Sequence, residues 1–208
     1  MTKALAALAG VLSAVLLLSA CGSTKQVDFA GTVADFTIAK GELTTDAGKP
    51  FQLATDTTGP LTLVFFGYTH CPDICPTVLS SVASGLAKLS PSQQKEVRLL
   101  FVTSDPKRDT GPVLRSYLSR FNPGFTGLTG DLTTIATIGK SIGIFVDEGQ
   151  KLSSGGYDPN SHSSYVIGVD NHHRGAVFWS GDTAPSQFAH DIRFLLEHGT
   201  DHLTSSQG

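Results

Sequence analysis

The stretch Leu61-Thr-Leu-Val-Phe-Phe-Gly-Tyr-Thr-His-Cys-Pro-Asp-Ile-Cys-Pro-Thr77 contains the strongest signals for both fold and chemistry. It begins with an apolar run, Leu61 to Phe66, which is typical of a strand buried on both faces. Beyond the cysteines, apolar residues recur at helical spacing as far as Leu89, and Pro76 suits a first helical turn because its missing N–H is not needed there. The stretch therefore predicts a strand, a loop with two cysteines, and a helix over residues 76–89.

The rest of the chain repeats this alternation. Apolar runs predict strands over residues 97–103, near 144–146, over 163–169 and over 175–180. Helical spacing predicts helices over 110–121, 132–142 and 185–198, the last of which stops at Gly199. Two short strands, 36–39 and 50–53, precede them and are joined by a turn in which Gly48 supplies a positive φ.

This order of elements predicts an α/β fold. A βαβ unit is followed by a ββα unit, which is the thioredoxin-like arrangement, with a mixed central sheet flanked by helices and an N-terminal β extension. The composition agrees, since 208 residues with 40% hydrophobic and 16% charged content fit a globular domain and not a disordered chain. A formal net charge of −3 leaves no basic surplus to neutralise phosphates, so we expect no nucleic-acid partner.

The N-terminus carries the pattern of a secretory signal. Lys3 is followed by an uncharged apolar run from Ala4 to Ala20, and no basic cluster follows that run to favour a permanent membrane span. The run ends in Leu18-Ser-Ala-Cys21, which resembles the bacterial lipobox, whose cysteine is lipidated and becomes the first residue of the mature protein. The alternative is plain cleavage after Ala20, which would leave Cys21 as a free thiol.

Cys71 and Cys75 remain as a single pair once Cys21 is assigned to the lipid, and an exported protein meets an oxidising environment. In helical backbone the i, i+4 spacing brings the two Cβ atoms to about 5–6 Å. Two such sulfurs can chelate a soft metal ion or, with backbone adjustment, form a disulfide. We expect the adjacent helix N-terminus to favour the thiolate. A purely structural disulfide is the weaker alternative, because it would close a very small loop.

Within the opening stretch, Phe66-Gly-Tyr-Thr-His-Cys-Pro-Asp-Ile-Cys-Pro-Thr77 resembles the signature of the Sco/SenC family of copper chaperones. Three further stretches resemble family patterns: Ser104-Asp-Pro-Lys-Arg-Asp-Thr110, Leu118-Ser-Arg-Phe121 and Phe125-Thr-Gly-Leu-Thr-Gly130. The resemblance covers residues 30 to 196. It implies a thioredoxin-like fold and a single copper ion bound by the two cysteines and one distal histidine.

The histidine at the matching position is His162, so the resemblance implies Cys71, Cys75 and His162 as the copper ligands. The family usually has an aspartate directly before this histidine, where this chain has Ser161. The donor chemistry agrees with copper, because two thiolates and an imidazole suit Cu(I) and can also hold Cu(II). Zinc would accept the same atoms but prefers a fourth ligand.

Other polar residues near the motif have simpler interpretations. We expect His70 to be a solvated loop residue and Asp73 to face solvent or cap the helix. Arg108 and Asp109 are expected to form a local ion pair, while Asp105 caps the loop that faces the site. The hairpin-tip residues His172 and His173 are expected to be exposed.

The expected division of the chain is a lipoprotein signal (1–20), a flexible tether (21–30), a thioredoxin-like copper-binding domain (31–200) and a C-terminal tail (201–208). The lipid would hold the domain on the extracytoplasmic side of the cell membrane.

Two functions remain open. The first is a metallochaperone, not an enzyme, that passes copper to the CuA-carrying subunit of cytochrome c oxidase during its assembly. The alternative is an extracytoplasmic thiol–disulfide oxidoreductase that reduces the cysteines of that copper site, with Cys71 and Cys75 as its redox-active pair. The Cys-x-x-x-Cys spacing and the presence of His162 favour copper. A peroxidase is disfavoured, because Tyr68 stands where a peroxiredoxin motif needs Thr or Ser.

Overall fold

An eight-stranded sheet forms the centre of the protein, which the computed structural model describes over residues 28–146, 164–200 and 203. The strand order across the sheet is β1-β8-β7-β4-β5-β6-β2-β3. In chain order the strands are β1 (Thr32–Thr37), β2 (Glu42–Thr45), β3 (Pro50–Gln52), β4 (Leu61–Gly67), β5 (Val97–Thr103), β6 (Thr126–Thr129), β7 (Val166–Asp170) and β8 (Arg174–Trp179).

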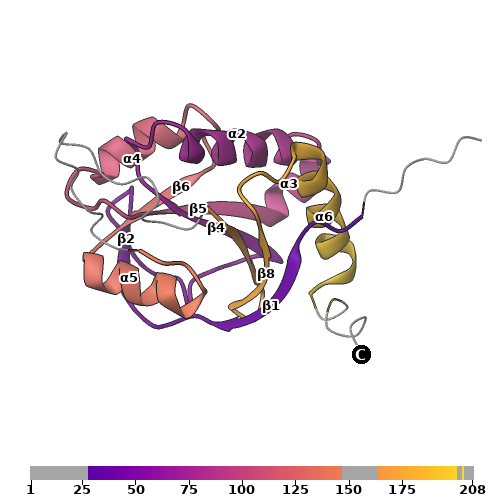
Figure 1. Ribbon diagram of the computed structural model, residues 1–208, viewed down its shortest axis with the longest axis horizontal. Helices are drawn as coiled ribbons and strands as arrows, with labels where there is room; N and C mark the ends of the chain where they lie inside the picture. The colour runs from indigo at the N-terminus through magenta and orange to yellow at the C-terminus, as the bar shows by residue number, and fades with distance from the viewer. Residues whose placement is uncertain (1–27, 147–163, 201–202, 204–208) are drawn as a thin grey trace, which may run out of the picture.

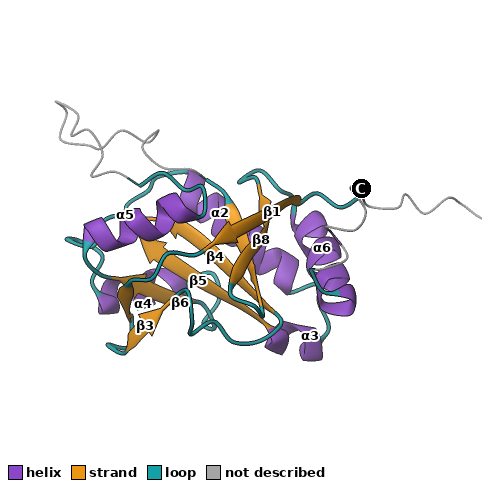
Figure 2. Cartoon of the chain, turned by 90° about the horizontal axis from the view of Figure 1, so that it is seen from below, coloured by secondary structure: helices purple, strands orange, loops and turns teal. Residues whose placement is uncertain are grey.

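Helices cover both faces of this sheet (Figure 1). They are α2 (Ile74–Leu86), α3 (Pro91–Glu96), α4 (Gly111–Leu118), α5 (Leu132–Ser141) and α6 (Pro185–His198). In Figure 1, α2 and α4 lie above the sheet and α5 lies below it. Figure 2 shows α6 and α3 together at one end of the sheet and α5 toward the other. None of the described helices is long and apolar enough to cross a membrane.

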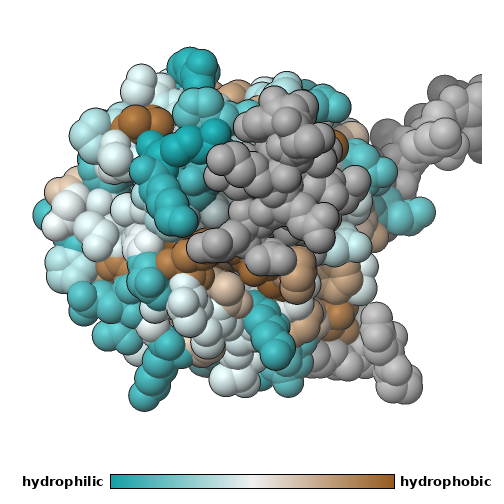
Figure 3. All heavy atoms as spheres, turned by 60° about the vertical axis from the view of Figure 1, so that its left-hand side comes forward, coloured by the Kyte–Doolittle hydropathy of each residue, from teal (hydrophilic) through white to brown (hydrophobic). Residues whose placement is uncertain are grey.

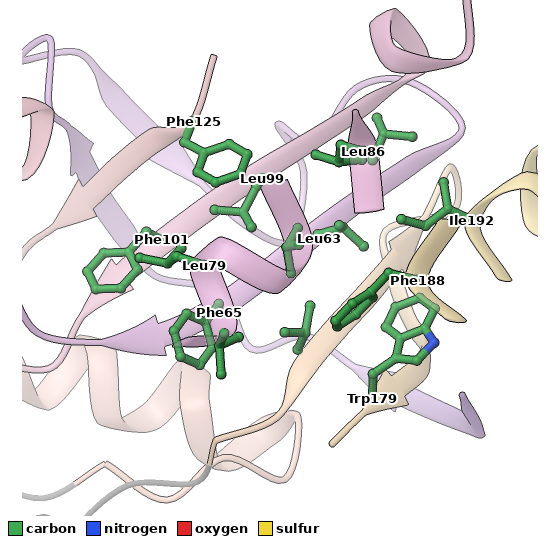
Figure 4. Packing of buried hydrophobic residues seen from close by; sticks show 14 of the residues in the cluster. Leu63, Phe65, Leu79, Leu86, Leu99, Phe101, Phe125, Trp179, Phe188 and Ile192 are labelled. Atoms are coloured by element: carbon green, nitrogen blue, oxygen red, sulfur yellow. The ribbon is translucent and has the colours of Figure 1, made fainter. Parts of the chain in front are cut away.

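Strand β4 is buried along its whole length and contributes to two hydrophobic clusters. Leu63 and Phe65 belong to the cluster beneath α2 and α6, where Figure 4 shows them packed with residues of both helices. Val64 and Phe66 belong to the opposite cluster, with Ile135 and other residues of α5. The alternation follows from the period of two in a strand, and it confirms the prediction of a strand buried on both faces.

The pairing of the central strands confirms the predicted thioredoxin-like arrangement. β4 runs parallel to β5, with Gly67 opposite Thr103, and antiparallel to β7. β7 and β8 form the predicted hairpin, which leads into α6. Because the parallel strands β4 and β5 end at the same edge of the sheet, the loops that follow them meet, and the Ser104 N–H donates to the Gly67 carbonyl at 2.7 Å.

The N-terminal β extension occupies both outer edges of the sheet. β1 pairs with β8 at one edge, and the β2–β3 hairpin pairs with β6 at the other. Gly48 has φ 75° in the turn between β2 and β3, as predicted. At the β1 edge, the buried carboxylate of Asp191 accepts hydrogen bonds from the backbone N–H groups of Ala30 and Gly31, each at 2.9 Å.

Several elements differ from the prediction. The strand expected near 144–146 is only a single bridge at Val146, where buried Ile144 and Val146 pack under α5 instead of forming a ladder. The helix expected over 110–121 ends at Leu118. The short elements α3, β2 and β6 were not predicted. α3 has no buried residue and hence no apolar stripe, but Ser90 and Gln93 form a capping box at its start.

Candidate metal centre

Cys71 and Cys75 lie at the junction between the β4 loop and the first turn of α2. Both are free thiols, and their exposed fractions are 8% and 0%. The Cys75 backbone N–H donates to Cys71 Sγ at 3.3 Å. α2 begins at Ile74, so Cys75 is helical while Cys71 precedes the helix. The structure therefore brings the two sulfurs together, as the spacing predicted.

The end of β4 is shaped to receive the Cys75 sulfur. A Cβ at Gly67 would stand 2.7 Å from Cys75 Sγ and 3.0 Å from the Phe101 ring, so a side chain at this position would collide with the sulfur. The sequence analysis gave Gly67 no role. Its signal was a glycine directly after a buried strand, which often marks a close approach of other atoms to the backbone.

The protonation of Cys75 differs from the expectation. Its hydrogen bond with Cys71 and its burial raise the pKa of the Cys75 thiol above the ordinary value of 9.0. For Cys75 in the metal-free protein, the hydrogen bond with Cys71, followed by burial, therefore outweighs the stabilisation of the thiolate that was expected from the helix N-terminus. A cation that binds this sulfur must displace its proton, which couples binding to pH.

Two buried tyrosines flank the cysteine pair. Tyr68 follows β4, and burial, followed by the charges of Cys71 and Cys75, raises the pKa of Tyr68 to about 12. Tyr117 comes from α4, and burial followed by the charges of Cys75 and Cys71 raises its pKa. The Tyr117 hydroxyl has no hydrogen-bond partner within the described part of the chain. The sequence analysis used Tyr68 only against a peroxidase and did not mention Tyr117 as a site residue.

The cysteine loop is attached to the end of β5 by the buried carboxylate of Asp109. This carboxylate accepts hydrogen bonds from the Thr69 N–H at 2.9 Å, the Thr69 hydroxyl at 2.6 Å and the Thr103 hydroxyl at 2.7 Å. The predicted Arg108–Asp109 ion pair is wrong, because Arg108 pairs with Asp105. Asp109 turns inward to the N–H and hydroxyl groups, which a buried carboxylate needs as partners.

The remaining polar predictions are mostly confirmed. The His70 side chain is 60% exposed and contacts the Thr69 hydroxyl at 3.1 Å. Asp73 is exposed at the N-cap of α2 and makes no side-chain capping bond. His172 is exposed, but the expectation for His173 is wrong, since it is half-buried and its Nδ1 lies 2.5 Å from the Thr57 hydroxyl.

Two of the predicted functional residues, His162 and Cys21, lie outside the described residues. Within 28–146, 164–200 and 203 there is no group of three or more His, Cys, Asp or Glu side chains able to hold a metal ion. The described part of the site thus consists of two adjacent thiols, which are soft donors suited to copper. The third ligand implied by the family resemblance, His162, remains a prediction.

Comparisons with known proteins agree with the fold and the motif. An SCO2-like protein of Rickettsia felis is 32% identical over 149 residues, which cover 70% of this chain and 70% of that protein. The structure of Bradyrhizobium japonicum ScoI with copper bound matches with a TM-score of 0.64 at 30% identity, over 78% of this chain and 98% of that chain.

Apo Sco1 from Thermus thermophilus, solved in solution, matches with a TM-score of 0.71 at 30% identity, over 84% of this chain and 100% of that chain. The aligned stretches span about two thirds of the length of the first curated relatives. The family model described as SCO1/SenC matches residues 31–197, which include the cysteine loop and every described strand and helix except the last residue of α6, His198. The chain therefore belongs to the SCO1/SenC family.

Proposed function

We propose that this protein is a copper metallochaperone that binds one copper ion and assists assembly of the CuA site of cytochrome c oxidase. The observation that carries the proposal is the pair of adjacent, buried, free thiols of Cys71 and Cys75 at the start of α2. Paired thiolates are soft ligands that suit Cu(I) and, together with an imidazole, can hold Cu(II). A similar protein, Bradyrhizobium japonicum ScoI, has a structure with copper bound.

His162 is the proposed third ligand. Strand β7 pairs with β4, with Val166 opposite Phe65, so the described chain enters β7 at the end of the sheet from which the cysteine loop departs. His162 is four residues before Val166, and one residue of extended chain spans about 3.3–3.6 Å. This connectivity supports the assignment, since the imidazole needs no long excursion to approach the thiols.

Delivery of copper to another protein requires that the ligands be reachable at the surface. Four large apolar side chains are exposed in the described chain: Ile74, Val113, Phe145 and Tyr165. Ile74 adjoins Cys75, and Val113 lines a hollow together with Thr69 and His70 of the cysteine loop. Figure 3 shows the side of the molecule that faces left in Figure 1, where hydrophobic residues are interspersed among hydrophilic ones. Exposed apolar residues beside the thiols support contact with a partner protein during transfer.

The second candidate function is reduction of the oxidase cysteines by the same thiol pair. It is supported by the two adjacent thiols, since the thiolate of one can attack a disulfide and the other can then resolve the mixed disulfide. The two functions differ in their use of His162, because only copper binding needs an imidazole.

A copper titration of the reduced full-length protein tests the function. We expect one copper per chain, and we expect His162→Ala to weaken Cu(II) binding at least about 100-fold, since loss of an outer-shell partner alone typically costs 10–100-fold. His172→Ala, at an exposed histidine of the hairpin tip, is the matched control and should bind as the wild type. Equal Cu(II) affinity in His162→Ala would refute the ligand assignment, and retained disulfide reduction without copper binding in the wild type would favour the oxidoreductase.

We also propose that Cys21 carries a lipid that holds the protein on the extracytoplasmic side of the cell membrane. The support is the lipobox-like sequence before Cys21. The described chain begins at Asp28, and Phe29 already packs against Phe194 of α6 with ring centroids 5.8 Å apart, so the domain starts within a few residues of the proposed anchor. Cys21→Ala should release the protein from the membrane fraction or block its maturation, and unchanged fractionation would refute lipidation.

A further inference from the structure

A hollow of about 460 Å³ lies between the cysteine loop and helix α4. One wall is a face of α4 that continues into the turn after it, since residues three or four apart share a helix face. The opposite face of α4 is packed in the core through Leu114 and Leu118. The lining of this hollow, hereafter the α4 hollow, includes Thr69, His70, Val113, Ser116, Tyr117 and Arg120.

Arg120 brings the one permanent charge to the α4 hollow, and its side chain is held in place. The guanidinium carbon lies 4.9 Å from the centroid of the Tyr117 ring, and Nε donates to the Tyr117 carbonyl at 3.3 Å. Because these contacts fix the planar fork, less side-chain entropy is lost when its other N–H groups bind a ligand. Those other N–H groups have no partner among the described residues.

The positive charge of Arg120 is not neutralised from within the α4 hollow, whose lining contains neither Asp nor Glu. Asp109 lies behind Thr69, but its carboxylate is occupied by the Thr69 N–H and hydroxyl and by a second hydroxyl. Arg115, on the same helix, pairs with Asp46 at 3.0 Å. Arg120 thus differs from its neighbour in having no carboxylate partner in the described part of the chain.

Apolar side chains are exposed beside this charge. Val113, in the lining, is 36% exposed, and Ile74, which adjoins Cys75 in the cysteine loop, is 42% exposed. A free carboxylate ion would leave these groups in water, whereas a segment of protein can cover them and reach Arg120 at once. Arginine and tyrosine next to apolar groups are also the residues that dominate protein interfaces. The combination therefore favours a protein partner over a small anion.

We propose that the α4 hollow is a docking site for an acidic side chain of the protein that receives copper. The carboxylate pairs with the Arg120 fork, which can bind it in bidentate fashion, and an apolar neighbour of the acidic residue covers Val113. The inference rests on the proposed function and deepens it, because the cysteine loop forms part of the hollow and a partner seated there lies beside the thiols. Such a charge pair orients the partner more than it adds affinity.

The test is an NMR titration of the reduced, copper-free, full-length protein with two synthetic peptides, acetyl-Leu-Glu-Leu-amide and acetyl-Leu-Gln-Leu-amide. The peptides differ only in the charge of the central side chain. We expect saturable shifts at Val113, Ser116 and Arg120, and about fivefold tighter binding of the Glu peptide, the upper range for one exposed ion pair. Equal binding of the two peptides, or shifts confined to other residues, would overturn the inference.

Arg120→Gln should abolish the preference for the Glu peptide. Arg98→Gln is the matched control, because Arg98 is also exposed and without a carboxylate partner among the described residues. It lies near the start of β5, at the opposite end of that strand from the cysteine loop, and its substitution should leave the preference intact. Equal losses in both variants would mean that net charge alone attracts the peptide, and would overturn the docking site.

Two further outcomes separate this inference from its alternatives. Sodium acetate that shifts the same residues and binds as tightly as the Glu peptide would identify a site for small anions and overturn docking. Because the titration contains no copper, copper binding is measured separately. Copper binding without peptide binding would overturn the docking site alone. Binding of the Glu peptide by a protein that binds no copper would overturn the proposed function and, with it, the identity of the partner.

Discussion

The cysteine end of the sheet and its β1 edge are each secured by a fully buried aspartate, but the two carboxylates secure different things. Asp109 binds the Thr69 N–H and two hydroxyls, and so holds the loop that precedes Cys71. Asp191 binds the backbone N–H groups of Ala30 and Gly31 and the Trp179 indole, and so holds the start of the N-terminal strand. A buried aspartate therefore supports the functional site at the cysteine end of the sheet and only the fold at the β1 edge.

The two aspartates differ in the kinds of hydrogen-bond donor that they bind. Asp191 satisfies two backbone N–H groups and an indole N–H, none of which can turn away if the carboxylate is lost. Two of the three donors to Asp109 are hydroxyls, which rotate freely and find other partners. The β1 edge therefore depends more on its aspartate for stability, whereas the cysteine end depends on its aspartate for geometry.

The largest expected effect is that of Asp191→Ala. The substitution leaves three buried or half-buried donors without an acceptor, and at about 1–3 kcal/mol for each unsatisfied group the loss should reach about 3–5 kcal/mol. Denaturant unfolding measures it, and copper stoichiometry at low temperature should stay at the wild-type value. A loss of copper binding in a folded Asp191→Ala protein would contradict the separation of the two ends.

Asp109→Ala should have a smaller effect on stability and a larger one on the site. We expect a loss of about 2–3 kcal/mol in unfolding free energy, because the Thr69 N–H is stranded while the hydroxyls relax. The freed loop should weaken copper binding several-fold in a competition titration. Wild-type copper affinity in this variant would show that Cys71 is positioned by α2 alone.

The pH dependence of stability also distinguishes the two regions, because the Cys75 thiol, which titrates, lies at the cysteine end. The folded-state pKa of Cys75 is raised above its ordinary value of 9.0, so the unfolded chain releases this proton first. The stabilising contribution is complete below that value and is lost as the pH rises above it, at up to about 1.4 kcal/mol per pH unit. Unfolding of the reduced, metal-free protein between pH 8 and about 10 should show this slope. Cys75→Ala should flatten it, and an equal slope in that variant would assign the effect to other groups.

The smallest expected effect is a gain in stability. Tyr117→Phe removes a buried hydroxyl that has no partner among the described residues, so the unfolding free energy should rise by up to about 1 kcal/mol. Thermal unfolding of the metal-free protein is the measurement. A clear loss of stability would contradict the finding that this hydroxyl has no partner among the described residues.

The order of elements and the cysteine pair could be predicted from the sequence because both depend on local signals. The apolar run before Gly67 and the i, i+4 cysteines are readable without the fold. The elements that were missed lack such a pattern: α3 buries nothing, and β2 and β6 have four residues each. Near Val146 the apolar pattern was present, but the chain packs beneath α5 and forms only a single bridge there.

The contacts of the site could not be predicted, because they join residues that are far apart in the chain. Asp109 is 40 residues from Thr69, and no spacing rule shows that its carboxylate turns inward instead of toward Arg108. The pKa of Cys75 likewise depends on burial that only the folded core creates. Gly67 was visible as a glycine in the sequence, but only the three-dimensional structure shows that a Cβ there would collide with the Cys75 sulfur.

The placement of the N-terminal extension on both outer edges also determines how one molecule meets another. A long, flat, regular edge strand offers a template on which a neighbouring chain can add its own strand and begin to aggregate. Here one edge is β1, whose register shifts between Val33 and Phe36, and the other is β3, which has three residues and begins with Pro50. Copies that meet edge to edge thus offer each other only short or irregular strands, which disfavours the addition of one sheet to another.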